Sequence, residues 1–136
     1  MYRFKISELS FNRIYNGVKR RISSIPDKLE WLFSNQGLRE RKKLLKFCGI
    51  HNKERCYLVA NGPSLKGMDM RFLEDKISFG LNRIYLAFDD LQFTTNYLVC
   101  VNSLVLSQFS EEFEGLDMPK FINWESRQLF RTHTHN

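Results

Sequence analysis

Four short, largely apolar segments recur along the second part of the chain, each bounded by residues that favour turns: 56–60, 77–81, 97–101 and 120–124. Runs of this kind are typical of strands buried on both faces. Helical segments are predicted between them, near residues 68–73, 83–88 and 103–113. Strands that alternate with helices form βαβ units. We therefore predict an α/β fold, a Rossmann-like parallel sheet of about four strands, with right-handed crossovers that place helices on both faces.

The segment before the first predicted strand differs from the rest in charge. Residues 1–55 hold 14 Lys and Arg against 5 Asp and Glu, a net charge of +9, whereas residues 56–136 hold 7 against 10, a net charge of −3. Apolar residues in the first part recur at helical spacing: Phe11, Ile14, Tyr15, Val18 and Ile22. Further helical segments are predicted from Pro26 onward and over 39–47. We predict two parts, a basic helical leader (1–55) and a sheet domain (56–136).

Each of the first three predicted strands is followed by an asparagine: Asn61, Asn82 and Asn102. Open parallel sheets bind ligands beyond the carboxyl ends of their strands, so the three amides are predicted to line one crevice. An amide offers a donor and an acceptor without charge, which suits sugar hydroxyls, base edges and phosphate oxygens. Asparagine is also common in turns because it tolerates a left-handed backbone, so each residue taken singly has a structural alternative.

The first of these turns has the most specific sequence. Gly62 lets backbone N–H groups approach a ligand, Pro63 restricts the backbone, and Ser64 supplies a hydroxyl at the expected start of a helix, where anions bind. Neither common phosphate-binding motif is present. Met68 and Asp69 stand where a P-loop has Lys and Ser or Thr, and Ser64 stands where G-x-G-x-x-G has its second glycine.

Three motifs follow one another in the second part of the chain: Asn61-Gly62-Pro63-Ser64-Leu65-Lys66, Phe79-Gly80-Leu81-Asn82-Arg83-Ile84-Tyr85 and Val101-Asn102-Ser103-Leu104. Over roughly residues 55–124 the chain resembles the amino half of the bacterial lipooligosaccharide sialyltransferases, and a wider bacterial family related to archaeal 6-hydroxymethylpterin pyrophosphokinase. The resemblance implies that four side chains contact the cytidine nucleotide of a CMP-activated sugar: Asn61, Ser64, Asn82 and Asn102. It also implies that Gly62 and Pro63 shape the turn. The wider family often has aspartate in place of Asn102, so this residue favours the sialyltransferase-like form.

By resemblance, the reaction is transfer of a sugar from a CMP-sugar to a hydroxyl of a glycan or lipid-linked acceptor, as in lipopolysaccharide biosynthesis. The resemblance implies no metal and no cofactor beyond the nucleotide-sugar donor. The catalytic histidine of these enzymes comes from later sequence, and His133 and His135 are interpreted as a ragged chain end, so the catalytic residues are unknown. We expect a truncated, amino-terminal half of a nucleotide-binding domain that binds the donor without turnover.

Two alternatives stay open. A diphosphokinase-like enzyme using ATP and Mg²⁺ would need acidic ligands, for which Asp69, Asp89 and Asp90 are the available residues. A non-catalytic fragment would bind nucleotide and do no chemistry.

The sequence also bears on location and partners. No apolar run is long enough to cross a bilayer, and the start of the chain lacks a secretory signal, so we expect a cytoplasmic protein. Cys48, Cys56 and Cys100 form no metal-binding or disulfide pattern. The basic leader either packs on the sheet domain or makes peripheral contact with the anionic inner membrane. Nucleic acid is not expected as a partner, because the basic residues form no recognisable binding motif.

Overall fold

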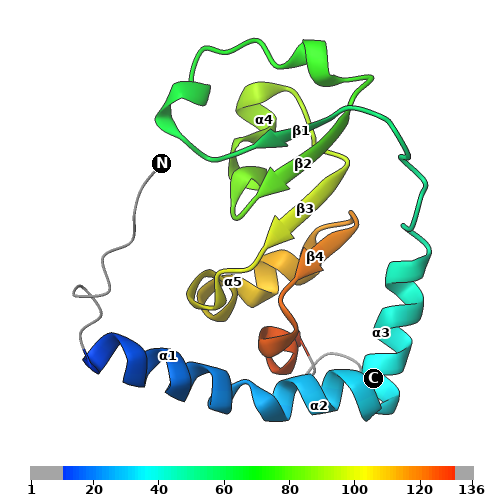
Figure 1. Cartoon of the computed structure of the whole chain (residues 1–136). Helices are drawn as coiled ribbons and strands as arrows, with labels where there is room; N and C mark the ends of the chain where they lie inside the picture. The colour runs from blue at the N-terminus through cyan, green and yellow to red at the C-terminus, as the bar shows by residue number, and fades with distance from the viewer. Residues whose placement is uncertain (1–10, 131–136) are drawn as a thin grey trace, which may run out of the picture. The chain divides into compact units, whose positions relative to one another are not determined.

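The computed structural model describes residues 11–130, except the side chains of Phe11, Asn12 and Arg20 (Figure 1). The chain divides into two compact units, Met1–Ile50 and His51–Asn136. His133 and His135 lie outside the described residues.

The first unit contains three consecutive helices: α1 (Phe11–Ser23), α2 (Ile25–Phe33) and α3 (Asn35–Leu45). Pro26 lies in the first turn of α2, where the N–H that proline lacks would have no partner within the helix. Ser34 caps α3, because its hydroxyl accepts a hydrogen bond from the Gly37 N–H at 2.9 Å. The predicted helical leader is therefore confirmed.

The corner between α2 and α3 is built around Gly37. A Cβ at this position would lie 2.2 Å from the carbonyl oxygen of Trp31, so the close approach of the two helices requires glycine. Gly37 is buried, whereas many apolar side chains of these helices are exposed: Ile14, Tyr15, Val18, Ile22, Leu29, Leu32, Leu44 and Leu45. The helices of this unit thus keep amphipathic surfaces.

The second unit is built on a four-stranded parallel sheet: β1 (Cys56–Val59), β2 (Ile77–Leu81), β3 (Tyr97–Cys100) and β4 (Lys120–Ile122). The strands lie side by side in chain order, β1-β2-β3-β4 (Figure 1). All four begin where the sequence predicts them to begin. The predicted α/β fold with a four-stranded parallel sheet is confirmed.

The connection between β1 and β2 differs from the prediction. Where a helix is expected over 68–73, only a short 3-10 turn forms, η3 (Arg71–Leu73), and another 3-10 turn, η2 (Pro63–Leu65), precedes it. Gly67 separates them with a φ of +85°, a conformation that interrupts a helix. The later connections contain η4 (Ile84–Ala87) with α4 (Phe88–Leu91), and then α5 (Ser103–Gly115), while η5 (Trp124–Phe130) follows β4.

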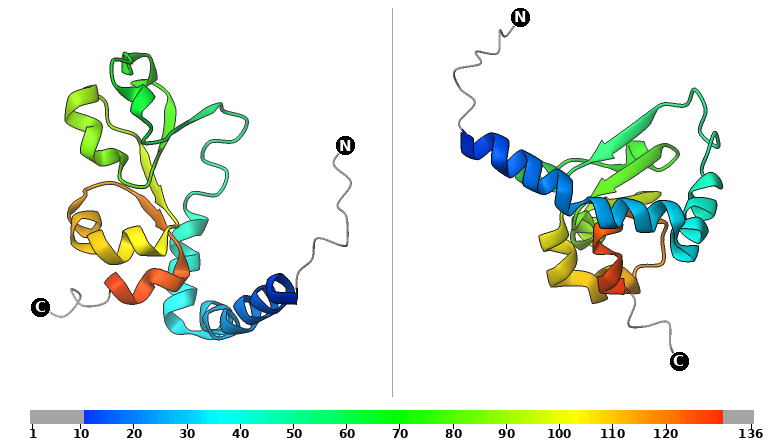
Figure 2. Two further views of the ribbon diagram at one scale, coloured as in Figure 1. Left: turned by 90° about the vertical axis from the view of Figure 1, so that its left-hand side faces the viewer. Right: turned by 60° about the horizontal axis from the view of Figure 1, so that its bottom comes forward.

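The helices of the second unit lie on one face of the sheet, which corrects the prediction of helices on both faces. Because the strands follow one another in chain order, each right-handed crossover returns on the same side. The left view of Figure 2 shows these helices on one side of the strands. The core lies between this face and the helices: Val59, Met70, Leu73, Ile84, Phe93, Leu98, Cys100, Leu106 and Phe113.

The opposite face of the sheet carries a row of aromatic side chains. The rings of Phe79 and Tyr97 stack with their centroids 4.8 Å apart, and Tyr97 lies 5.9 Å from Phe121. The Tyr97 hydroxyl also lies 2.7 Å from Nε2 of His51. These rings join β2, β3 and β4 across the sheet, since stacked and tilted aromatic pairs attract one another.

Candidate functional site

The three predicted asparagines lie at the carboxyl edge of neighbouring strands. Val59 pairs with Gly80, so Asn61 and Asn82 each lie two residues beyond a paired position. Gly80 in turn pairs with Leu98, so β3 runs parallel to β2 and ends at the same edge of the sheet, where Asn102 follows it. Neighbouring strands are about 4.7–4.9 Å apart, which keeps successive strand ends within reach of one small ligand. The parallel sheet thus brings Asn61, Asn82 and Asn102 to one edge.

Asn82 has a left-handed backbone, with a φ of 51°. Its N–H donates to the carbonyl of Val99 at 2.9 Å, and its side-chain oxygen lies 3.7 Å from the Cys100 sulfur, whose thiol donates to it. The same residue therefore closes the turn after β2 and places its amide at the sheet edge. Burial raises the pKa of the Cys100 thiol, so this donor keeps its proton at neutral pH.

Asn102 is the N-cap of α5. Its side-chain oxygen accepts hydrogen bonds from the N–H groups of Leu104 at 3.1 Å and Val105 at 3.4 Å. The residue is exposed at the start of the helix. Because the oxygen faces the helix, the amide N–H₂ is the part of Asn102 that can donate to a ligand.

The Asn61–Ser64 turn lies at the end of β1, and Asn61 and Ser64 are both exposed. Ser64 lies in η2, a 3-10 turn of only three residues, and not at the start of a longer helix. The N–H groups of Leu65 and Lys66 are bonded within the turn, to the carbonyls of Gly62 and Pro63. The turn therefore offers a ligand the Asn61 amide and the Ser64 hydroxyl.

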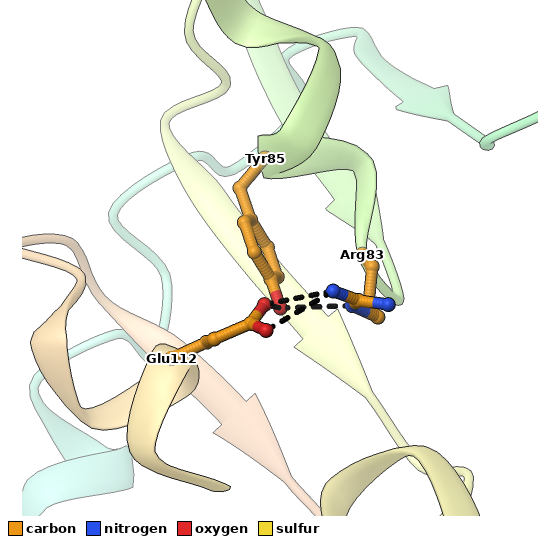
Figure 3. A network of polar contacts seen from close by, with 3 residues as sticks. All are labelled: Arg83, Tyr85 and Glu112. Atoms are coloured by element: carbon orange, nitrogen blue, oxygen red, sulfur yellow. Dashed lines mark hydrogen bonds and ion pairs between the residues drawn. The ribbon is translucent and has the colours of Figure 1, made fainter. Parts of the chain in front are cut away.

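A polar network fastens the turn after β2 to α5, and Figure 3 shows its three members, Arg83, Tyr85 and Glu112. The Tyr85 hydroxyl donates to Glu112 at 2.6 Å, and Nη2 of Arg83 donates to both oxygens of the same carboxylate, at 2.9 and 3.1 Å. The guanidinium also stacks on Phe109, 3.4 Å from the ring centroid. Hydrogen bonds from Tyr85 and then Arg83 lower the pKa of Glu112, which stays ionised. Arg83 follows Asn82 directly, so the network helps to hold the site.

The aspartates considered as metal ligands are Asp69, Asp89 and Asp90. Arg71 forms two side-chain hydrogen bonds with Asp69, at 2.9 and 2.7 Å, and together with the Arg71 N–H it lowers the pKa of Asp69 to about 2. Asp89 and Asp90 lie in the first turn of α4. Within residues 11–130, no three His, Cys, Asp or Glu side chains gather as metal ligands would.

A fourth asparagine, Asn123, falls within the last predicted strand, 120–124. The structure ends β4 at Ile122, so Asn123 is the first residue beyond it, as Asn82 is beyond β2. Its side-chain oxygen and the hydroxyl of Ser126 are both buried and have no hydrogen-bond partner in the described part of the chain. The recurring strand-then-asparagine pattern was the signal that could have identified this residue.

Comparison with known proteins adds no relative: no family model, no curated protein and no solved structure matches this chain. Among the helices of residues 11–130, none has the length and apolar character needed to span a bilayer.

Proposed function

We propose that the chain binds a CMP-activated sugar at the carboxyl edge of its sheet, as part of a sialyltransferase-like glycosyltransferase of surface glycan synthesis. The observation that carries this proposal is the placement of Asn61, Asn82 and Asn102 at three adjacent strand ends of one parallel sheet. Crevices beyond such strand ends are the usual ligand sites of open α/β sheets. The Asn-Gly-Pro-Ser turn and the two later motifs supply the resemblance to enzymes that use CMP-sialic acid.

Two of the amides are held in place by the protein before any ligand arrives. The oxygens of Asn82 and Asn102 accept hydrogen bonds from the Cys100 thiol and the α5 backbone, which turns their N–H₂ groups outward from those bonds. Donors fixed in this way suit an anionic or carbonyl-bearing ligand, because little freedom is lost on binding. We assign them to the nucleotide, whose phosphate would leave as an acceptor hydroxyl attacks the sugar.

Calorimetric titration with CMP, CDP, UDP and ATP, each with and without EDTA, tests the assignment. We expect CMP to bind more tightly than ATP, and chelation of divalent metal to leave its affinity unchanged, because neutral amides replace the lysine of a P-loop. Tight ATP binding that depends on Mg²⁺ would reject the CMP-sugar proposal in favour of the diphosphokinase alternative.

Two substitutions in the first turn test the side chains directly. Asn61 and Ser64 are exposed residues on a short turn, so changing either to alanine is expected to spare the fold. Each change should cost roughly 1–3 kcal/mol of CMP binding if the polar group is paired with the ligand. Unchanged affinity in both variants would place the site elsewhere.

Asn82 and Asn102 need variants that keep their structural roles. Asn102→Asp keeps the helix cap but replaces the N–H₂ donors by a carboxylate oxygen. Asn82→Gly keeps the left-handed backbone and removes the amide. We expect each to weaken CMP binding roughly tenfold while the far-ultraviolet circular dichroism spectrum stays that of the parent. Parental affinity in both variants would leave these asparagines as turn and cap residues only.

For the first unit we propose peripheral contact with an anionic membrane, which would suit a lipid-linked acceptor. Exposed apolar residues such as Val18 and Leu45 lie on helices that also carry Lys19 and Lys42. Each cation near an anionic surface contributes about 1 kcal/mol. The double variant Lys19→Glu, Lys42→Glu should therefore lose flotation with anionic liposomes at low salt. Lys76→Glu, a reversal at an exposed site in the second unit, is the control, and equal flotation of all three proteins would contradict the contact.

A further inference from the structure

Two unpartnered oxygens lie in a single turn at the end of β4. The Asn123 side-chain oxygen and the Ser126 hydroxyl are both buried without a hydrogen-bond partner among the described residues. The Ser126 N–H donates to the Asn123 carbonyl at 3.2 Å, so the backbone of the turn is closed while its side-chain oxygens are not. Ser126 is only 4% exposed.

Buried polar atoms of this kind are uncommon in folded proteins, because a buried oxygen without a partner costs stability. Each such atom calls for an explanation, such as backbone strain, a bound water or ion, or a functional role. The contrast within this protein is direct, since the side-chain oxygens of Asn82 and Asn102 both accept hydrogen bonds from the chain itself. At the end of β4, the amide oxygen of Asn123 receives no such hydrogen bond from the described residues.

The β4 turn is continuous with the candidate nucleotide site. Cys100 pairs with Ile122, so Asn123 lies opposite Val101, the residue directly before Asn102. The turn after β1 lies at the other end of the same edge, three strand spacings or about 14 Å away. A ligand that starts at the β1 turn and passes Asn82 and Asn102 would extend to the β4 turn, where contact with the two buried oxygens requires the turn to open.

The chemistry of the two oxygens selects the ligand group. An amide oxygen only accepts, so it requires an O–H or N–H donor, and a serine hydroxyl both donates and accepts. A phosphate or carboxylate offers the amide oxygen no donor. The neighbouring cation, Arg127, donates to the Trp124 carbonyl at 3.0 Å and lies 4.7 Å from the centroid of the Trp124 ring. A hydroxyl or amide N–H of the ligand, rather than a phosphate or carboxylate oxygen, therefore fits the amide oxygen of this turn.

We propose that Asn123 and Ser126 form the subsite for the sugar of the nucleotide sugar, the part of the donor that carries hydroxyl and amide hydrogens. This inference rests on the proposed function, which assigns the nucleotide to the ends of β1, β2 and β3. The subsite would give the sheet edge two separable halves, one for the nucleotide and one for the transferred group.

The test compares CMP with CMP-sialic acid on the full chain and on two variants, Asn123→Ala and Ser126→Ala. We expect each variant to bind CMP-sialic acid roughly 5–30-fold more weakly than the parent and to bind CMP as the parent does. Ser107→Ala is the matched control, because its exposed hydroxyl already donates to the Leu104 carbonyl at 2.9 Å. A second measurement, thermal unfolding without ligand, should give Ser126→Ala a midpoint no lower than that of the parent, because the change removes an unsatisfied buried oxygen.

Three outcomes of this comparison overturn the subsite. Equal weakening for both probes would assign the two residues to folding, and unchanged affinity for both probes would mean that internal water satisfies the oxygens. If the parent binds CMP-sialic acid no more tightly than CMP, the sugar makes no favourable contact with the protein. If the parent binds neither probe, the proposed function fails, and the subsite is judged with free N-acetylneuraminic acid. A shift of the Asn123 side-chain amide resonance that is lost in Ser126→Ala would then support it, and its absence would reject it.

Discussion

Replacing Gly80 by alanine is the sharpest test of how the sheet packs against its helices. Gly80 lies within β2, on the face that carries the core. A Cβ there would lie 2.5 Å from Cγ2 of Ile84 and 2.7 Å from Oγ1 of Thr95. Ile84 is 1% exposed and Thr95 is 2% exposed, so neither neighbour can turn toward solvent. The added methyl group must therefore push η4 and β2 apart.

The magnitude follows from two opposing effects. Overpacking of a filled core costs typically about 1–3 kcal/mol. Alanine also restricts the unfolded chain more than glycine does, which returns about 0.4–1 kcal/mol. We expect a net loss of about 1–2 kcal/mol in the free energy of unfolding, or about 4–16 °C in the melting temperature of a domain of this size.

Urea unfolding followed by circular dichroism measures the loss. Gly115→Ala is the control, because nothing lies within 4 Å of a Cβ at that helical position, and alanine should stabilise it slightly. Adding Ile84→Leu removes the β-branch methyl that lies closest, so the double variant should be more stable than the sum of the single changes predicts. Equal stability of Gly80→Ala and the parent would refute the close packing of η4 on β2.

Three further perturbations test other contacts. Gly37→Ala should destabilise the α2–α3 corner by about 1–3 kcal/mol and speed proteolysis there. Gly17→Ala is the control, because nothing lies within 4 Å of a Cβ at that position. If Gly37→Ala resists protease as well as the parent does, the close approach of the two helices is contradicted. Asn102→Ala should lower stability by about 0.5–2 kcal/mol through loss of the α5 cap, as measured in urea, and a loss of the same size in Asn102→Asp would show that capping is not the cause. Since the pKa of Glu112 is lowered in the folded protein, its contribution to stability is present above the ordinary value of 4.5 and disappears as the pH falls through the folded pKa. The stability difference between the parent and Glu112→Gln should thus shrink in acid unfolding below about pH 4.5, and a difference independent of pH would exclude the network as its source.

The sequence alone determined the elements with a strong local signal. β2 spans Ile77–Leu81, as its apolar run predicts, and α5 begins at Ser103, directly after an asparagine suited to capping. The placement of Asn61, Asn82 and Asn102 at one sheet edge was also predictable. It requires only that successive strands be parallel and end at those residues, which the alternation of strands and helices already implies.

Local signals failed where chain geometry competes with hydrophobic pattern. The segment over 68–73 is predicted to be helical, yet it forms only the 3-10 turn η3 after Gly67 turns the chain with a positive φ. The sequence pattern also places Asn123 inside the last strand, because Trp124 extends the apolar run. The pairing with β3 ends earlier, at Ile122. Where a strand ends depends on its neighbour as well as on its own residues.

Only the tertiary structure decided the order of the strands, and with it the single helical face. Strand order depends on contacts between residues far apart in the chain, which no periodicity encodes. The same holds for Arg83 and Glu112, which are 29 positions apart and meet because α5 packs beside the turn after β2. The unpartnered oxygens of Asn123 and Ser126 are likewise a property of burial. Residue types set which hydrogen bonds are available to this chain, and packing determines which of them are made.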